Sequence, residues 1–144
     1  MRVLEEAVKK SSEMIMKSDL VNMKRVMRRL ELADKNDVPS IKGKVACRIS
    51  AADELVTTEL LFSGVFQDID AFQIAALCSC LVYTDAKSEQ KLTKDVRLTE
   101  PFSKLQQVAD KVATIMIESK IPLEKEEYVK KFNPDLMEIV QRWC

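Results

Sequence analysis

Residues 41–64 read IKGKVACRISAADELVTTELLFSG, and they place a short β-type run beside the start of a helix. The run VACRI, residues 45–49, favours a strand because β-branched residues fit a pleated surface. Lys42-Gly43 can form the tight turn of a β-hairpin, with residues 38–41 as its first arm and residues 45–49 as its second. Ser50 and Asp53 then form a variant capping box, so a helix is expected from Ala51. The stretch predicts a hairpin joined to helices.

The composition of the whole chain favours helices. Its 144 residues suit one domain, and 2 Gly with 4 Pro are too few turn residues for a sandwich or barrel of many strands. We therefore expect a mainly α fold, a helical bundle fragment with a small β-hairpin that is part of a winged helix.

The charges balance over the chain. Lys+Arg 23 equals Asp+Glu 23, so no global field attracts the molecule to nucleic acid or membrane, and an anion-binding surface must be local. No apolar stretch approaches the ~20 residues that span a bilayer, so we expect no membrane partner.

The first 50 residues are expected to hold two helices before the hairpin. Residues 3–17 are amphipathic, and Ser18-Asp19 offers a cap for a second helix from about 19 to 33. The apolar stripe of the second helix recurs at helical spacing, in Leu20, Met23, Met27 and Leu30. Its other faces carry the densest basic cluster of the chain: Lys24, Arg25, Arg28 and Arg29.

The remaining sequence reads as four helices around a polar loop. Asp70 and Gln73 form a second capping box before a wide apolar stripe, and residues 85–94 are an expected exposed loop. Thr99 and Pro101 begin a long helix with apolar positions Phe102, Leu105, Ala109, Val112 and Met116. A short helix is expected from Leu123 to Phe132.

Asn133-Pro134-Asp135 caps the last predicted helix, which has one apolar face formed by Leu136, Ile139, Val140 and Trp143. We interpret this face as a surface that docks on a neighbouring domain. Because the sequence stops within the stripe without a helix cap, we interpret the chain as an excised piece of a larger protein, truncated at its C-terminus.

The chain shows no catalytic apparatus. It has no histidine, no GxxxxGK[ST] and no GxGxxG, and the carboxylate pairs Glu5-Glu6 and Glu126-Glu127 have helix-surface spacing. We predict no catalytic, cofactor-binding or metal residues, and no cofactor. Cys78-Ser-Cys80 lacks zinc-knuckle spacing, and the four cysteines suit free thiols in an intracellular, reducing compartment. Cys47 and Cys78 are expected to be buried.

Six basic residues are candidate contacts for a nucleic-acid phosphate backbone: Arg25, Arg28, Arg29, Lys42, Lys44 and Arg48. A positive wing can lie against phosphates. The same residues also suit plain solubilising charge, and arginine stems pack on neighbouring domains. Both interpretations stay open.

A family resemblance joins these features. IKGKVACRISAADELVTTELLFSGVFQDI resembles the segment that links the winged helix to the C-terminal helical (DSHCT) domain in Ski2-like RNA helicases, the exosome cofactor family. RVMRRLELADKNDV resembles that family's arginine-rich helix and turn, and AALCSCLVY and FNPDLMEIVQRWC resemble its helical-domain pattern. ISAADEL followed by FSGVFQDI is more similar to the nuclear Mtr4/Dob1 type than to the cytoplasmic Ski2 type.

The resemblance implies three parts: residues 1–17 as the end of the helical return from the family's arch, 18–50 as the winged-helix part, and 51–144 as the helical bundle. It implies a parent ATP-dependent RNA helicase that uses ATP and Mg in its motor domains and delivers RNA to the nuclear exosome and its adaptors. This piece would dock on the motor domains and help form the RNA channel, without enzymatic activity of its own. The chain departs from the family at Glu31, where glycine is usual.

A second class of function stays open beside the helicase module. The same sequence suits an autonomous helical or winged-helix adaptor whose exposed apolar helix binds a protein partner. The two are distinguished by whether motor motifs accompany this domain in the same reading frame.

Overall fold

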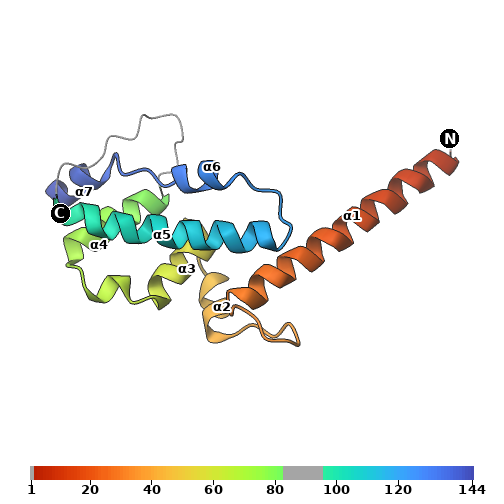
Figure 1. The fold of residues 1–144 in the computed structure, drawn as a ribbon, viewed down its shortest axis with the longest axis horizontal. Coiled ribbons are helices and arrows are strands. Elements are labelled where there is room, and N and C mark those ends of the chain that lie inside the picture. The colour runs from red at the N-terminus through yellow and green to blue at the C-terminus, as the bar shows by residue number, and fades with distance from the viewer. Residues whose placement is uncertain (1, 83–95) are drawn as a thin grey trace.

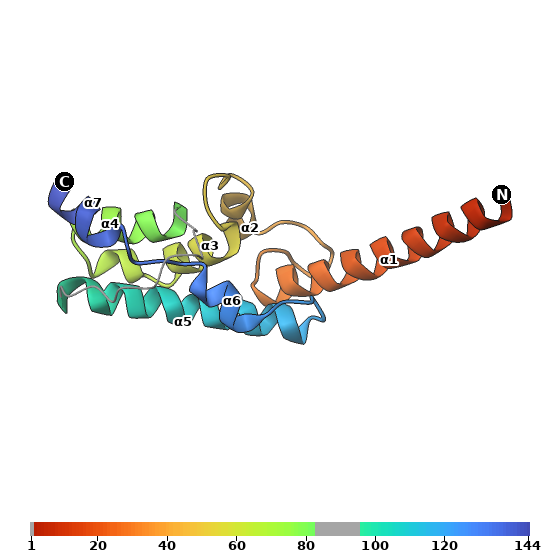
Figure 2. The ribbon, with the colours of Figure 1, turned by 90° about the horizontal axis from the view of Figure 1, so that it is seen from above.

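A computed structural model describes residues 2–82 and 96–144, with side chains described from Met16 onward. The polar loop expected at 85–94 lies outside these residues. Helices make up the regular structure: a long N-terminal helix stands away from a compact bundle formed by the other described residues (Figures 1 and 2). The prediction of a mainly α fold is confirmed.

The N-terminal segment is one helix, α1 (Arg2–Arg29), and not two. The expected cap at Ser18-Asp19 is wrong, because the helix runs through both residues. Both side chains are exposed. On an exposed face, a serine or aspartate costs a helix only a fraction of a kcal/mol, ~0.5 each, so the surrounding helix formers prevail.

Helix α1 ends in a Schellman motif. Leu32 N donates to Met27 O at 2.8 Å and Glu31 N donates to Arg28 O at 3.2 Å. Glu31 occupies the left-handed position of the motif, with φ 58°. Glycine adopts such a backbone conformation without strain. The glycine that is usual at this position in the family would therefore suit the motif better than Glu31 does.

The predicted β-hairpin is wrong. Residues 41–46 form helix α2 (Ile41–Ala46), and Ser40 caps it by accepting a hydrogen bond from Gly43 N at 3.1 Å. The nearest pairing is a single isolated bridge between Ala33 and Pro39, and the described residues contain no strand. Gly43 faces the backbone of Leu32, where a Cβ would lie 2.0 Å from the carbonyl oxygen. Glycine therefore allows α2 to pack closely on the turn after α1, and it does not form a hairpin turn.

Helix α3 (Glu54–Phe62) begins later than predicted. The helix was expected from Ala51, but Asp53 is its N-cap, with Oδ1 accepting from Val56 N at 3.1 Å. A short 3-10 helix, η1 (Val65–Gln67), follows Gly64 and leads toward the next helix.

The capping box before helix α4 (Ala71–Val82) is confirmed. Asp70 N donates to Gln73 Oε1 at 2.9 Å, and Gln73 N donates to Asp70 Oδ1 at 2.8 Å. Gln73 Nε2 also donates to Arg97 O at 2.9 Å. This satisfies the carbonyl that lies four residues before Pro101, whose ring nitrogen has no hydrogen to donate.

Helix α5 (Val96–Glu118) forms the centre of the bundle and packs against α3, α4 and α6 (Figure 1). It begins before the expected start at Thr99. Its predicted stripe is confirmed at four positions that are buried in the core: Phe102, Leu105, Ala109 and Val112. It ends in a second Schellman motif, with Lys120 at φ 66° and Ile121 N donating to Met116 O at 3.0 Å.

Two short helices complete the bundle, α6 (Lys125–Lys130) and α7 (Met137–Trp143). The α6 helix packs on α5, and α7 packs on α4. Before α7, Asp135 N donates a hydrogen bond to Asn133 Oδ1 at 2.9 Å. No side chain caps α7 itself, so the predicted capping role of this turn is wrong.

Candidate functional site

The basic cluster on α1 is held largely by acidic partners. Lys24 Nζ lies 2.9 Å from Asp37 Oδ2, and Arg28 Nη2 lies 2.6 Å from Asp37 Oδ1. The hydrogen bond from Lys24, and then that from Arg28, lowers the pKa of Asp37 below its usual value. These contacts tie the loop after α1 back onto α1.

The other two arginines of the cluster also have partners. Arg29 Nη1 lies 2.6 Å from Glu118 Oε2 at the end of α5, and Arg25 Nη1 donates to Asn22 Oδ1 at 3.4 Å. All three candidate arginines are exposed, so their role as RNA contacts stays a prediction. Arg28 and Arg29 pair with residues outside α1, whereas Arg25 bonds a residue of α1 itself.

The basic residues around α2 divide into two kinds. Lys42 pairs with the buried carboxylate of Glu59 on α3, which also lies 3.1 Å from Lys111 Nζ on α5. Lys44 and Arg48 are exposed and form no ion pair with the described residues. Of the three predicted contacts in α2 and just after it, these two are the ones available to an external phosphate.

The predicted docking face on α7 is partly open. Leu136 and Val140 are half-buried, whereas Ile139 is 62% exposed and Trp143 is 90% exposed. The two outer side chains present apolar surface at the far end of the bundle from α1. Their role in domain docking stays a prediction.

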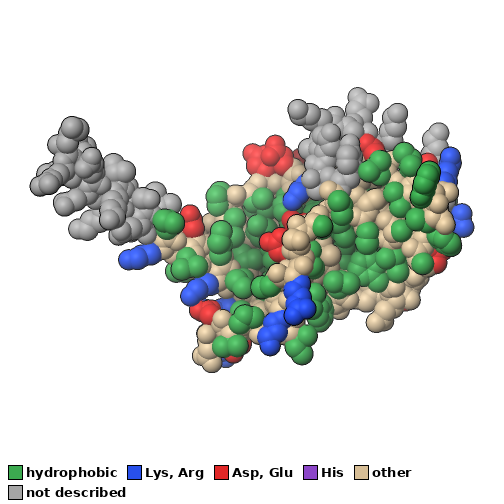
Figure 3. Space-filling model, turned by 180° about the vertical axis from the view of Figure 1, so that it is seen from behind, with side chains coloured by type: hydrophobic (Ala, Val, Ile, Leu, Met, Phe, Trp, Pro, Cys, Tyr) green, Lys and Arg blue, Asp and Glu red, His purple; other side chains and the backbone are tan. Residues whose placement is uncertain are grey.

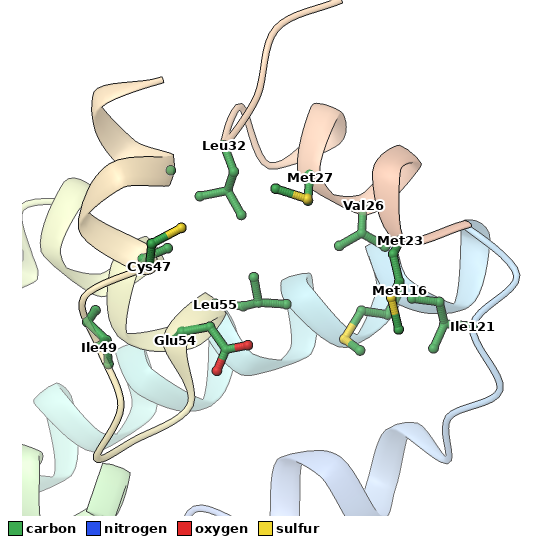
Figure 4. A pocket seen from close by; sticks show the side chains of 12 residues that line it. Met23, Val26, Met27, Leu32, Cys47, Ile49, Glu54, Leu55, Met116 and Ile121 are labelled. Atoms are coloured by element: carbon green, nitrogen blue, oxygen red, sulfur yellow. The ribbon is translucent and has the colours of Figure 1, made fainter. Parts of the chain in front are cut away.

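A larger apolar feature lies where α1 meets the bundle. We call it the α1–α3 groove, and its volume is about 540 Å³. Figure 3 shows hydrophobic side chains gathered around a hollow at this junction, and Figure 4 shows the lining side chains directed into it. The lining comes from α1, α2, α3, α5 and the segments that follow α1, α2 and α5: Met23, Val26, Met27, Leu32, Gly43, Ala46, Cys47, Ile49, Glu54, Leu55, Met116 and Ile121.

Sequence reasoning missed this groove. Met23 and Met27 were assigned to a helix stripe, but Met23 is 55% exposed and Met27 is 36% exposed, while their neighbours Val26 and Leu30 are buried. The sequence does carry one signal of the groove. Apolar residues cover two faces of α1, and this apolar stripe is wider than packing against one neighbouring element requires.

The cysteine predictions need correction. Cys47 and Cys78 are exposed, and Cys80 is the buried thiol. Cys47 caps the end of α2 at the rim of the groove, and Cys78 lies on the outer face of α4. Burial raises the pKa of the Cys80 thiol to about 12.

Within residues 2–82 and 96–144, no group of three or more Asp, Glu or Cys is placed to hold a metal ion. The same residues contain no helix long and apolar enough to cross a membrane.

The helical bundle and the turn before it belong to a known class of domain. The family model described as DSHCT (NUC185) domain matches residues 36–144, so the chain belongs to the DSHCT family. Among curated proteins, the human "Exosome RNA helicase MTR4" is 41% identical over 138 residues, which are 95% of this chain and 13% of that protein. The predicted resemblance to Mtr4-type helicases is confirmed.

Two further RNA helicases are similar to this chain over nearly its whole length. The Schizosaccharomyces pombe "ATP-dependent RNA helicase mtr4" is 40% identical over 141 residues, 98% of this chain and 13% of the relative. The Arabidopsis thaliana "DExH-box ATP-dependent RNA helicase DExH9" is 37% identical over 141 residues, 98% of this chain and 14% of the relative. The chain thus spans about an eighth of the length of the first curated relatives it matches.

Proposed function

We propose that this chain is an accessory domain of an ATP-dependent RNA helicase that unwinds RNA and delivers it to the nuclear exosome. The observation that carries the proposal is the 41% identity to an exosome RNA helicase over 95% of the chain. ATP and Mg would be bound by the motor domains of the parent protein, and the parent would act in the nucleus. The domain itself contributes docking surface and part of the RNA channel.

The exposed face of α7 supports the docking role. Ile139 and Trp143 present apolar side chains that a neighbouring domain would cover, with Leu136 and Val140 behind them. We also propose that the chain consists of three parts, which end at residues 17, 50 and 144. Under that division, residues 1–17 belong to the arch return, and the rest of α1, together with α2, belongs to the winged-helix part.

A chimera tests the proposal directly. The matching 138-residue segment of the human relative is replaced by this chain, and ATP-dependent RNA unwinding is compared with that of the segment-deleted protein. We expect the chimera to restore unwinding and the paired substitution Ile139→Asp with Trp143→Ala to weaken it. The matched control is Val82→Asp, which changes another exposed apolar side chain. A chimera as inactive as the deletion would contradict the proposal.

The RNA-binding role is proposed for Lys44 and Arg48, with weaker roles for Arg25, Arg28, Arg29 and Lys42, which have partners within the chain. Few phosphates can be neutralised by such a patch, so binding of single-stranded RNA is expected to be weak and to fall with added salt. Fluorescence anisotropy of the 144-residue chain should show weaker binding for Lys44→Gln with Arg48→Gln. Lys104→Gln on α5 is the matched control and should leave binding unchanged.

A protein-interaction adaptor is the second candidate, favoured by the 90% exposure of Trp143 and by the α1–α3 groove. The chimera separates the two, because an adaptor would bind its partner without restoring unwinding.

A further inference from the structure

We infer that Lys24 and Arg28 form a binding site for an RNA phosphate, which Asp37 occupies in the free chain, so that RNA must displace this carboxylate to bind there. We call the two cations the α1 fork. The inference rests on the proposed RNA-binding role of the chain. It adds Lys24 to the candidate contacts and makes Asp37 an autoinhibitory residue.

The α1 fork holds both oxygens of one carboxylate. Arg28 Nε and Nη2 donate to Asp37 Oδ1 at 3.0 and 2.6 Å, and Lys24 Nζ donates to Asp37 Oδ2 at 2.9 Å. A phosphodiester also carries one negative charge over two oxygens, and a guanidinium group binds carboxylates and phosphates in the same way. A phosphate can therefore replace the Asp37 carboxylate without a rearrangement of the fork.

The three side chains lie at the surface of the molecule. Their exposed fractions are 41% for Lys24, 44% for Arg28 and 35% for Asp37, so a ligand reaches the fork directly. Ion pairs this exposed contribute little to stability, because water solvates both charges and salt screens them. Glu59, which is also paired with two cations, is only 8% exposed and is closed to such an exchange.

The loop that carries Asp37 is held in place without this carboxylate. Asp34 N donates to Val38 O at 3.0 Å, and Asp34 Oδ1 accepts from Asn36 N at 2.8 Å and from Val38 N at 2.9 Å. Asp37 has φ 63°, a left-handed conformation that asparagine also tolerates. The substitution Asp37→Asn should therefore remove the negative charge and leave the loop folded.

The test measures binding of a labelled oligouridylate of about 10 nucleotides to the 144-residue chain by fluorescence anisotropy, over a series of salt concentrations. Asp37→Asn should tighten binding about fivefold at low salt, because both cations become available to the RNA. It should also steepen the slope of log K against log salt by about 0.7, the value for one further phosphate of a single strand. The matched control is Asp68→Asn, which removes an exposed carboxylate between η1 and α4 and should leave the slope unchanged.

A double variant assigns the gain in affinity to the α1 fork. When Arg28→Gln is added to Asp37→Asn, the affinity and the salt slope should return to those of the unsubstituted chain or below. A gain that persists in the double variant would overturn the inference, because the phosphate would then bind elsewhere.

Two further results would overturn the inference. The first is an Asp37→Asn chain that binds RNA no more tightly than the Asp68→Asn chain. The second is an equal gain in affinity for a labelled polyglutamate peptide, because an acidic protein segment would then be the occupant. The proposed function is judged separately by the chimera. Restored unwinding together with an ineffective Asp37→Asn would contradict the inference alone.

Discussion

Tyr128 on α6 donates its phenolic hydrogen bond to Asp53 Oδ2 at 2.8 Å, while Asp53 Oδ1 caps α3 by accepting from Val56 N at 3.1 Å. The carboxylate of Asp53 therefore caps the N-terminus of α3 and anchors α6. Lys131 Nζ lies 3.5 Å from the same Oδ2. The connection between α3 and α6 depends on this side chain.

The first prediction separates the two roles of Asp53. Tyr128→Phe removes the hydrogen bond to Oδ2 and should lower the free energy of unfolding by about 1 kcal/mol. Asp53→Ser retains a capping oxygen but cannot reach Tyr128, so it should cost a similar amount, whereas Asp53→Ala should cost about 2 kcal/mol. Urea unfolding measures each value. Fully additive effects of Tyr128→Phe and Asp53→Ser would show that the two residues are not coupled.

The second prediction concerns Gly43. A Cβ at this position would lie 2.0 Å from Leu32 O, so Gly43→Ala must separate α2 from the turn after α1. We expect a loss of about 2 kcal/mol or more, by analogy with overpacked cores. Gly64→Ala is the control: it has φ 77° but its nearest neighbours lie 3.7 Å away, so it should cost about 1 kcal/mol. Similar costs for the two alanines would contradict the packing role of Gly43.

The third prediction uses the two left-handed positions that end α1 and α5. Glu31 and Lys120 have φ values of 58° and 66°, which strain a residue with a side chain. Glu31→Gly and Lys120→Gly should each raise the free energy of unfolding by about 1 kcal/mol. Ser103→Gly, at an exposed position inside α5, should instead lower it by about 0.5 kcal/mol. Differential scanning calorimetry distinguishes the two signs.

The fourth prediction concerns the buried carboxylate of Glu59. Its side chain is 8% exposed and pairs with Lys42, which is 16% exposed, and with Lys111, which is 62% exposed. Glu59→Ala would leave the Lys42 ammonium largely desolvated and unpaired, at a cost of about 2 kcal/mol. Lys111→Ala removes only the exposed partner and should cost less than about 1 kcal/mol. Equal losses in chemical unfolding would contradict this ranking.

The fifth prediction concerns thiol reactivity. Cys47 and Cys144 should label fastest with iodoacetamide, Cys78 more slowly because partial desolvation of its exposed thiol raises its pKa, and Cys80 only on unfolding. Since the pKa of Cys80 is about 12 in the folded chain and 9.0 in the unfolded chain, its protonated form contributes stability below pH 9.0. That contribution is lost as the pH rises toward about 12, because the unfolded thiol ionises first. Cys80→Ala should flatten this part of the pH profile.

Local signals were sufficient for the bundle. The Asp70 and Gln73 box and the buried stripe from Phe102 to Val112 were both predictable, because caps and helical periodicity act within a few residues. The hairpin failed for a different reason. Ser40, the N-cap of α2, is a local signal for a helix at residues 41–46, whereas the close approach of Gly43 to Leu32 is a tertiary contact that no short window of sequence contains.

The surfaces were harder to predict than the helices. The α1–α3 groove is assembled from residues as far apart as Met23 and Ile121, so no window of sequence describes it. Lys42 resembled Lys44 in sequence, yet only the structure shows that Glu59 engages the first and leaves the second exposed. Charge alone does not distinguish a structural cation from an available one.

The junction after α1 has a mechanical consequence. The 28 residues of α1 extend about 42 Å, and the contact between Leu32 and Gly43 is one of those that fix the angle of this rod to the bundle. A rotation of about 10° at that joint would move the far end of the rod by about 7 Å, since displacement scales with length. Because Gly43 has no side chain, the chain after α1 can pack closely on α2. A methyl group at this position would change the angle between α1 and the bundle.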